Sequence, residues 1–173
     1  LKLPPGSDPR EVYRRVKEEY GAKFAIEWTE PRGFNNTFAI LVRGEDARRF
    51  KLKTISDAGS YAAKWRAGFG QDFMSRPDGY AGFVRTYGLK FTELREMDLS
   101  LTYRALVERQ VDLIAGNSTD GLIARHDLVQ LADDRHYFPP YDAVPLIRRE
   151  TLALSLEIRI ALKSLGGLIS VAE

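Results

Sequence analysis

The sequence predicts an α/β protein whose sheet is mainly parallel and covered by helices. Residues 91–115 read as strand, helix and strand joined by short links, and such a unit places both strands parallel in one sheet. The run 37–42, TFAILV, is apolar without interruption, as in strands buried on both faces of a parallel sheet. Segments with helical spacing lie before, between and after these strands, which completes the pattern of this class.

The chain opens with an amphipathic helix. Asp8 is its expected cap, Pro9 fits the first turn, and Glu11 is the expected reciprocal acceptor. Gly21 is expected to end it. The apolar face consists of Val12, Tyr13, Val16 and Tyr20.

The elements expected next alternate between strands and helices. They are a strand at 23–28 broken by 31–33, the strand 37–42, a helical piece at 45–50, a helix from Ser56 to about Trp65, a strand at 66–70 and a helix at 78–87. The strand–helix–strand unit follows as 91–97, 99–109 and 111–115, with Leu99, Tyr103, Leu106 and Val107 facing inward. The last elements are strands at 128–131 and 143–147 and a helix with Ile158, Ala161, Leu162 and Leu165 on one face, ended by Gly166 and Gly167.

The composition excludes several classes of function. The 173 residues are 44% hydrophobic and 29% charged, as in globular domains, and no apolar run approaches the roughly 20 residues that span a bilayer. A formal net charge of +2 provides no large basic field, so nucleic acid is not expected as a partner. The absence of cysteine excludes disulfides, thiolate nucleophiles and cysteine-ligated metals, and leaves the compartment open.

Both ends of the sequence suggest a longer parent chain. The sequence begins with Leu1 and has no basic-then-apolar signal segment, so any targeting peptide is expected outside it. Residues 170–173, SVAE, form a capping-box pattern that normally opens a helix, yet the sequence stops there. We therefore expect that the parent chain continues.

A polar turn after a buried strand is the first candidate site. In open α/β sheets, ligands bind beyond the carboxyl ends of the strands, and short polar side chains there could hold a small polar ligand. The alternative is a capped turn in which Ser118 or Thr119 begins a following helical turn. The residues of the turn are Asn117, Ser118, Thr119, Asp120 and Gly121.

Neither a catalytic residue nor a metal site is expected. Histidines and carboxylates gather late in the chain, but their spacing matches no metal motif, and such clusters are usually solvated ion pairs. Ser118 lacks the G-x-S-x-G turn of a nucleophile. The histidine and carboxylate cluster consists of His126, Asp127, Asp133, Asp134 and His136.

Aromatic residues and one arginine form the second candidate site. Phe38, Tyr137 and Tyr141 lie at strand ends or beside a Pro-Pro segment, where ring faces can hold a cation that donates no hydrogen bond. Phe34 and Phe138 lie there too, but such residues are more often part of the core. Arg76 could bind a carboxylate with two parallel hydrogen bonds, although a lone loop arginine is usually solvated.

Six segments together resemble a known family. They are GFNNTFAILV (33–42), TISD (54–57), RPDGYAGF (76–83), YGLKFTELREMDLSLTYRALVERQVDLIAGNSTDGLI (87–123), DLVQLADDRHYFPPYDAVPLIR (127–148) and EIRIALKSLGGLISVAE (157–173). In this order they resemble the substrate-binding proteins of glycine betaine, choline and carnitine ABC importers, which take up osmoprotectants. The resemblance covers nearly the whole chain.

The resemblance implies a periplasmic-binding-protein-like (type II) fold. Such proteins have two α/β lobes joined by crossover strands and close on a quaternary ammonium compound by a hinge motion. It implies that residues 1–33 are a remnant of the first lobe, that 34–117 form the second lobe, and that 118–173 contain the return crossover and a C-terminal first-lobe remnant. The first lobe would then be incomplete.

The resemblance also implies site residues. Phe38 and Tyr141 correspond to members of an aromatic cage, Arg76 corresponds to the carboxylate partner, and Asn35, Asn36 and Thr37 line the crossover. The family usually has tyrosine where this chain has Phe38, and an aromatic residue where it has Asn117. Since the first-lobe contributions would be absent as well, we expect weak or no betaine binding by this chain alone.

The expected function is therefore a non-enzymatic one, without a cofactor. The resemblance implies a solute-binding fragment of an ABC importer, acting on the periplasmic or extracellular side with a membrane permease as its partner. The alternative is a truncated, non-transporting lobe that acts as an interaction or oligomerising domain, completed by the missing lobe or by a second copy. A third, enzymatic interpretation would need a measured activity that depends on His126 or His136.

Overall fold

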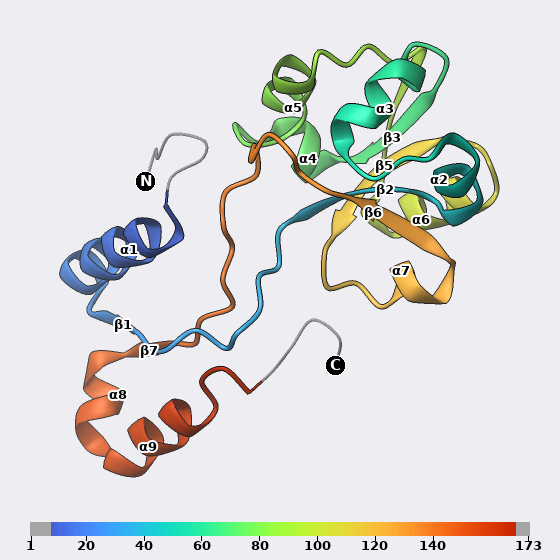
Figure 1. The fold of residues 1–173 in the computed structure, drawn as a ribbon. Helices are drawn as coiled ribbons and strands as arrows, with labels where there is room; N and C mark the ends of the chain where they lie inside the picture. Colours follow the sequence, from blue (N-terminus) through green and yellow to red (C-terminus); the bar gives the residue numbers. More distant parts are fainter. Residues whose placement is uncertain (1–7, 169–173) are drawn as a thin grey trace. The chain divides into compact units, whose positions relative to one another are not determined.

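The computed structural model describes residues 8–168, and the expected capping pattern at 170–173 lies outside this range. The chain divides into two units (Figure 1). Unit 1 consists of Leu1–Asn36 and Pro139–Glu173, and unit 2 consists of Thr37–Phe138.

Unit 2 is built on a five-stranded mixed sheet. Its strands, in sheet order, are β4 (Glu93–Met97), β3 (Arg66–Gly70), β5 (Leu113–Asn117), β2 (Phe38–Arg43) and β6 (Leu128–Leu131). β3 pairs parallel with β4 and β5, whereas β2 pairs antiparallel with β5 and β6. The α/β class and the mainly parallel sheet are confirmed, because β4, β3, β5 and β6 run in the same direction. β2 runs against them, whereas the sequence predicted a parallel strand there.

The burial of β2 explains why its direction was predicted wrongly. Five of its six residues belong to the apolar run that suggested a parallel strand, and Ile40 lies opposite Ala115 on one side and Leu131 on the other. An uninterrupted apolar run indicates that the strand is central and covered on both faces, because only such a strand can bury side chains on both sides. A central strand can be buried in this way in either direction.

Helices cover both faces of this sheet. They are α2 (Gly44–Phe50), α3 (Ile55–Ala62), α4 (Gln71–Ser75), α5 (Tyr80–Tyr87), α6 (Leu99–Val107) and α7 (Leu122–Arg125). Side chains alternate along β2, so Ile40 and Val42 join the core that α3, α4 and α5 cover. Ala39 and Leu41 join the second core, which α6 covers.

Most elements of unit 2 lie where the sequence predicted them. The strands at 66–70 and 128–131 are confirmed as β3 and β6, and the short helix α4 was not predicted. Tyr103 and Leu106 are buried as expected, whereas Leu99 and Val107 are 47% and 41% exposed. Their inward orientation was a wrong prediction, and the two residues are the first and last of α6.

Unit 1 has a two-stranded sheet and three helices within its described residues. They are α1 (Pro9–Phe24), β1 (Ile26–Trp28), β7 (Leu146–Arg148), α8 (Arg149–Leu154) and α9 (Leu156–Ser164). β1 and β7 are antiparallel, and Glu27 lies opposite Ile147. Leu152 is the only buried hydrophobic residue among the described residues of this unit.

The start of α1 is confirmed, but its end is not. Asp8 Oδ1 accepts hydrogen bonds from the amides of Arg10 and Glu11. The helix continues past Gly21 to Phe24, which moves the following strand from the expected 23–28 to Ile26–Trp28. A glycine inside a helix costs only about 1 kcal/mol, and the ring contact between Tyr20 and Phe24 favours the extra turn.

The C-terminal elements of unit 1 differ slightly from the prediction. The strand expected at 143–147 is Leu146–Arg148, since Pro145 cannot donate a backbone hydrogen bond. α8 was not predicted, because six residues are too few for a periodic pattern to stand out. α9 ends before Gly166, and Gly167 has a φ of +69°, as expected for glycines that terminate a helix.

Candidate functional site

The polar turn after β5 is joined to the start of β2. Ser118 Oγ accepts a hydrogen bond from the Thr37 amide at 3.1 Å, and the Ser118 amide donates to the Thr37 carbonyl at 2.9 Å. In α7, the first amide, that of Leu122, donates to Asp120 Oδ1 at 3.0 Å. The alternative in which Ser118 or Thr119 caps the following helix is therefore wrong. Ser118 extends the pairing of β5 with β2 instead.

The end of β5 is tightly packed against α6. Asn117 is its last residue and lies opposite Phe38, which begins β2. The next residue inward, Gly116, lies against the hydroxyl of Tyr103, and a Cβ atom at Gly116 would overlap that oxygen. Burial raises the pKa of Tyr103, and the negative charge of Asp120 raises it further, so the hydroxyl stays neutral.

Phe38 belongs to a group of packed aromatic rings. Its ring lies 5.0 Å from that of Phe73, edge to face, and 5.9 Å from that of Phe138. Phe138 stacks on Phe83, which is fully buried, so the group continues into the core. The expectation that Phe138 serves the core is confirmed. Phe38 itself is half-buried.

Arg76 lies beside Phe38 and holds a carboxylate of its own chain. The Arg76 guanidinium lies 5.6 Å from the centroid of the Phe38 ring. Its Nε and Nη2 donate to the two carboxylate oxygens of Asp78 at 2.9 and 2.8 Å. The geometry expected for a ligand carboxylate is therefore present, and Asp78 engages it in this structure.

Two segments far apart in the sequence lie side by side in unit 1 (Figure 1). The Tyr141 amide donates to Asn35 Oδ1 at 2.7 Å, and the Asn36 amide donates to the Tyr141 carbonyl at 3.0 Å. Asn35 also pairs antiparallel with Asp142. Three predicted site residues, Asn35, Asn36 and Tyr141, are thus brought together by backbone and amide contacts.

The histidine and carboxylate cluster is divided by the fold. No group of three or more histidines or carboxylates that could hold a metal occurs within residues 8–168. Asp127 forms an exposed ion pair with Arg48, which confirms the solvated interpretation for this residue. For Asp133 that interpretation is wrong. Its carboxylate accepts hydrogen bonds from the Tyr87 hydroxyl and from the amides of Tyr137, at 3.0 Å, and Phe138, at 2.8 Å.

Asp133 and Phe73 are the two contributors to this region that the sequence interpretation missed. Aspartate side chains often bind nearby backbone amides, and the bonds to residues four and five positions later could have suggested this role for Asp133. Phe73 lies on α4, which has five residues and therefore too little periodicity to identify its inner face.

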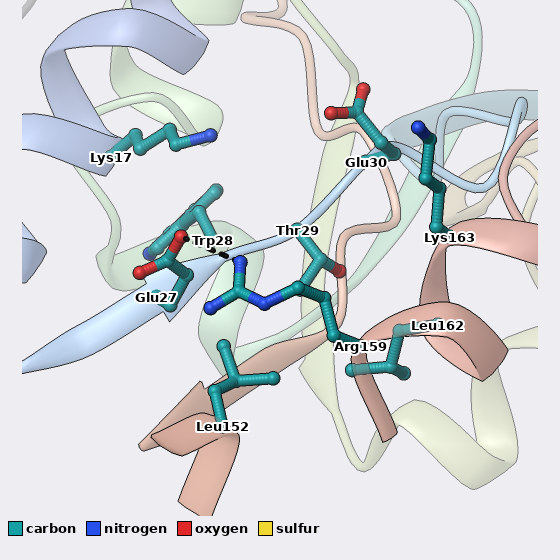
Figure 2. A pocket seen from close by; sticks show the side chains of 9 residues that line it. All are labelled: Lys17, Glu27, Trp28, Thr29, Glu30, Leu152, Arg159, Leu162 and Lys163. Carbon is teal, nitrogen blue, oxygen red and sulfur yellow. Dashed lines mark ion pairs between the residues drawn. The ribbon is translucent and has the colours of Figure 1, made fainter. Parts of the chain in front are cut away.

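Unit 1 contains a separate polar pocket of about 280 Å³ (Figure 2). The pair of Glu27 and Arg159 crosses it, with 3.9 Å between their charged atoms. Trp28 Nε1 is buried there without a hydrogen-bond partner among the described residues. None of the predicted site residues lines this pocket. Its lining consists of Lys17, Glu27, Trp28, Thr29, Glu30, Leu152, Arg159, Leu162 and Lys163.

Among the helices of residues 8–168, none has the length and apolar character needed to cross a membrane.

Comparisons with known proteins give consistent matches. The sequence model described as the substrate binding domain of ABC-type glycine betaine transport system matches residues 4–171. The carnitine transport binding protein OpuCC of Listeria monocytogenes is 35% identical over 167 residues, which cover 96% of this chain and 54% of that protein. The glycine-betaine-binding protein of Pseudomonas aeruginosa is 36% identical over 156 residues, covering 84% and 50%.

A solved structure agrees with these matches. A crystal structure described as a glycine betaine/carnitine/choline ABC transporter superposes with a TM-score of 0.87 at 36% identity, covering 100% of this chain and 64% of that one. The confirmed type of fold is therefore that of the periplasmic binding proteins. The chain spans about half the length of the curated relatives it matches.

Proposed function

The chain belongs to the family of substrate-binding domains of ABC-type glycine betaine transport systems, and we propose that it serves as a solute-binding piece of such an importer. Its ligand would be a quaternary ammonium compound. The observation that carries the proposal is the position of Phe38 beside Arg76, with the guanidinium 5.6 Å from the ring centroid. Glycine betaine carries a cationic head and a carboxylate, and this pair offers an aromatic ring and a guanidinium.

The chemistry of the ligand favours this assignment. A trimethylammonium group has no N–H to donate, so ring faces attract it, each worth about 0.5 to 2 kcal/mol depending on desolvation. Phe38 supplies one such ring, and we assign Tyr141 as a second. Arg76 would bind the ligand carboxylate in the manner in which it binds Asp78. We also assign ligand-binding roles to Asn35, Asn36 and Thr37 and to the polar turn 117–120.

We assign unit 2 to the second lobe of the binding protein and unit 1 to part of the first lobe. On this assignment a permease in the membrane would receive the solute, and the protein would act on the outer side of that membrane. The chain spans about half the length of its curated relatives. The family resemblance also implies a tyrosine hydroxyl that Phe38 lacks. We therefore expect betaine affinity weaker than micromolar for this chain alone.

An NMR titration tests the proposal because it detects weak binding and locates it. We expect glycine betaine at millimolar concentration to cause saturable shifts at Phe38, Arg76 and Tyr141. The control ligand is 3,3-dimethylbutanoate, which has the same shape and carboxylate but a neutral carbon in place of the nitrogen. It should bind several-fold more weakly, because it lacks the cation–π attraction.

A matched pair of variants completes the experiment. Phe38→Leu keeps an apolar side chain but removes the ring face, and should weaken betaine binding. Phe50→Leu makes the same change in α2, where Phe50 packs on Tyr61 at 4.6 Å, and should leave binding unchanged. The absence of saturable shifts with betaine, or equal affinity for the neutral ligand, would contradict the proposal, and micromolar affinity would contradict the expected weakness.

A second candidate function is an interaction or oligomerising domain. It is favoured by the apolar side chains that unit 1 leaves exposed, among them Leu154 at 86%, Leu156 at 69% and Ile160 at 59%. Monomeric proteins rarely expose such side chains together. Sedimentation equilibrium separates the candidates, since a stable dimer supports this function and a monomer that responds to ligand supports the first.

A further inference from the structure

The helix α5 is held at its first turn by the segment that leaves β6. Tyr137 is buried, and its hydroxyl donates to the carbonyl of Gly79 at 2.8 Å. Gly79 precedes the first residue of α5, and its own amide donates to the Arg76 carbonyl at 3.0 Å. Tyr137 is thus two hydrogen bonds away from the backbone of Arg76.

The same segment holds the last turn of α5. Tyr87 is the final residue of the helix, and its hydroxyl donates to the carboxylate of Asp133. This hydroxyl also accepts a hydrogen bond from the Arg135 amide at 3.1 Å. Between the two ends, a Cβ atom at Gly82 would overlap the ring and hydroxyl of Tyr137, so the helix and the segment 133–138 are in close contact.

Asp133 is also linked to Phe38, through Phe138. Its carboxylate accepts from the Phe138 amide at 2.8 Å, and the Phe138 ring lies 5.9 Å from that of Phe38. One carboxylate therefore supports both halves of the proposed ligand pair. Through Tyr137 and Gly79 it supports Arg76, and through Phe138 it supports Phe38.

We propose that Asp133 and Tyr137 are positioning residues for ligand recognition, which fix α5 and the turn 76–79 so that Arg76 meets the ligand carboxylate. This inference rests on the proposed function. It predicts that loss of the Tyr137 hydroxyl affects carboxylate recognition more than recognition of the ammonium head, because Gly79 is linked to Arg76 and not to the ring of Phe38.

The hydroxyls involved keep their protons at neutral pH. Burial raises the pKa of Tyr137. Burial also raises the pKa of Tyr87, and its hydrogen bond to Asp133 adds to the shift. Both groups therefore remain donors, and the contacts described above persist across the physiological pH range.

The first test is hydrogen exchange of the 173-residue chain. Tyr137→Phe removes only the hydroxyl, and we expect about tenfold faster exchange in residues 76–83, the effect of losing one net hydrogen bond. Residues 99–117 should exchange as before, which shows that the fold is retained. Tyr80→Phe is the matched control. It removes a hydroxyl from the same helix, and none of the described residues forms a hydrogen bond with that hydroxyl. It should leave the exchange unchanged.

The second test compares two ligands by NMR titration. Choline has the trimethylammonium head of glycine betaine but no carboxylate. We expect Tyr137→Phe to weaken glycine betaine binding by about tenfold, as for one lost hydrogen bond, and choline binding by at most a small factor. If the Tyr137 hydroxyl had only a structural role, its loss would weaken the binding of both ligands equally.

A third variant tests the carboxylate. Asp133→Asn should accelerate exchange in 76–83 as well, whereas Asp134→Asn is its neighbouring control, since Asp134 accepts from the Ser56 amide instead. When combined, Asp133→Asn and Tyr137→Phe should have less than the summed effect, because both act through the segment 133–138.

The outcomes separate the two proposals. If the unaltered chain shows no saturable betaine binding, the proposed function fails, and the exchange of 76–83 still decides whether Tyr137 holds α5. If Tyr137→Phe leaves that exchange unchanged, the inferred support is overturned. If exchange accelerates but both ligands weaken equally, Tyr137 has a structural role only and the positioning role is overturned.

Discussion

At the residue scale, Asp112 is a partly buried carboxylate that pairs with two arginines. It lies just before β5, and its carboxylate accepts from the Arg66 amide at 2.9 Å and from Arg43 Nη2 at 3.0 Å. Arg43 is itself buried at 7% exposure and donates to the carbonyls of Leu106 and Val111. The ion pair of Asp112 and Arg43 is therefore part of a largely buried network in which most polar atoms have a hydrogen-bond partner.

Because of this network, the contribution of Asp112 to the stability of the folded state depends on pH. Burial alone would raise the pKa of Asp112, but the hydrogen bonds from Arg66 and Arg43 outweigh it and the pKa lies below its usual value. A carboxyl group whose pKa is lower in the folded state stabilises that state above its unfolded pKa of about 3.9. The contribution is lost as the pH falls through the lowered value.

We predict that Asp112→Asn destabilises the protein by about 1 to 3 kcal/mol at pH 7, because it removes one of the two carboxylates that pair with the buried Arg43, the other being Asp46. The difference from the unaltered chain should shrink as the pH falls below about 4, because Asp112 then takes up its proton in the unfolded chain before it does so in the folded one. Urea unfolding over a pH series measures it. Asp127→Asn is the control, since its pair with Arg48 is exposed and should matter little. Equal losses for both variants would contradict the prediction.

At the scale of elements, the contact of β5 with α6 depends on Gly116. A Cβ atom there would overlap the Tyr103 hydroxyl and lie 2.9 Å from Leu41 Cδ1. We predict that Gly116→Ala costs about 1 to 3 kcal/mol through overpacking, and that adding Tyr103→Phe recovers part of it by removing the hydroxyl. Thermal unfolding measures both changes.

The control for this prediction is Gly121→Ala. No atom of residues 8–168 lies within 4 Å of a Cβ atom at Gly121, and its backbone is in the right-handed helical region, so alanine should be tolerated. The overpacking explanation is wrong if Gly116→Ala is tolerated equally well. It also fails if Tyr103→Phe recovers nothing.

The positions of elements could be predicted better than their directions. Gly70 bounds β3, and the strand 66–70 was placed correctly because a local pattern records where a strand ends. The direction of β2 depends on its partners, which lie more than 70 residues further along the chain. The residue pattern within 37–42 does not indicate the direction of β5 and β6.

The candidate site was predictable in its residue types but not in its contacts. Ser118 is predicted as a site residue because it follows the end of a strand, yet its hydrogen-bond partner Thr37 is 81 residues away. The charged residues that neighbour Asp133 in the sequence predict a solvated carboxylate. Its real partners include Tyr87, 46 residues earlier, which only the fold brings near.

At the scale of the whole molecule, the two units differ in how much they bury. In unit 2, two hydrophobic clusters pack on the sheet. In unit 1, Leu152 is the only buried hydrophobic residue among those described, and the sheet has two strands of three residues each. Isolated two-stranded sheets are marginally stable, so most of the free energy of folding must come from unit 2.

We therefore predict unequal hydrogen-exchange protection. Amides of β2 and β5 should exchange only through global unfolding, whereas amides of β1, β7 and α9 should exchange through local opening, at least about a hundredfold faster. Similar protection in both units would contradict this prediction.

Repeating the exchange at several protein concentrations shows whether a second copy covers unit 1. Protection of α8 and α9 that rises with concentration would mean that association buries the exposed side chains of Leu154 and Leu156, in favour of the oligomerising function. Constant low protection would mean that unit 1 stays uncovered in the isolated chain. Its apolar surface would then require a different polypeptide, and a solute-binding role would depend on that partner.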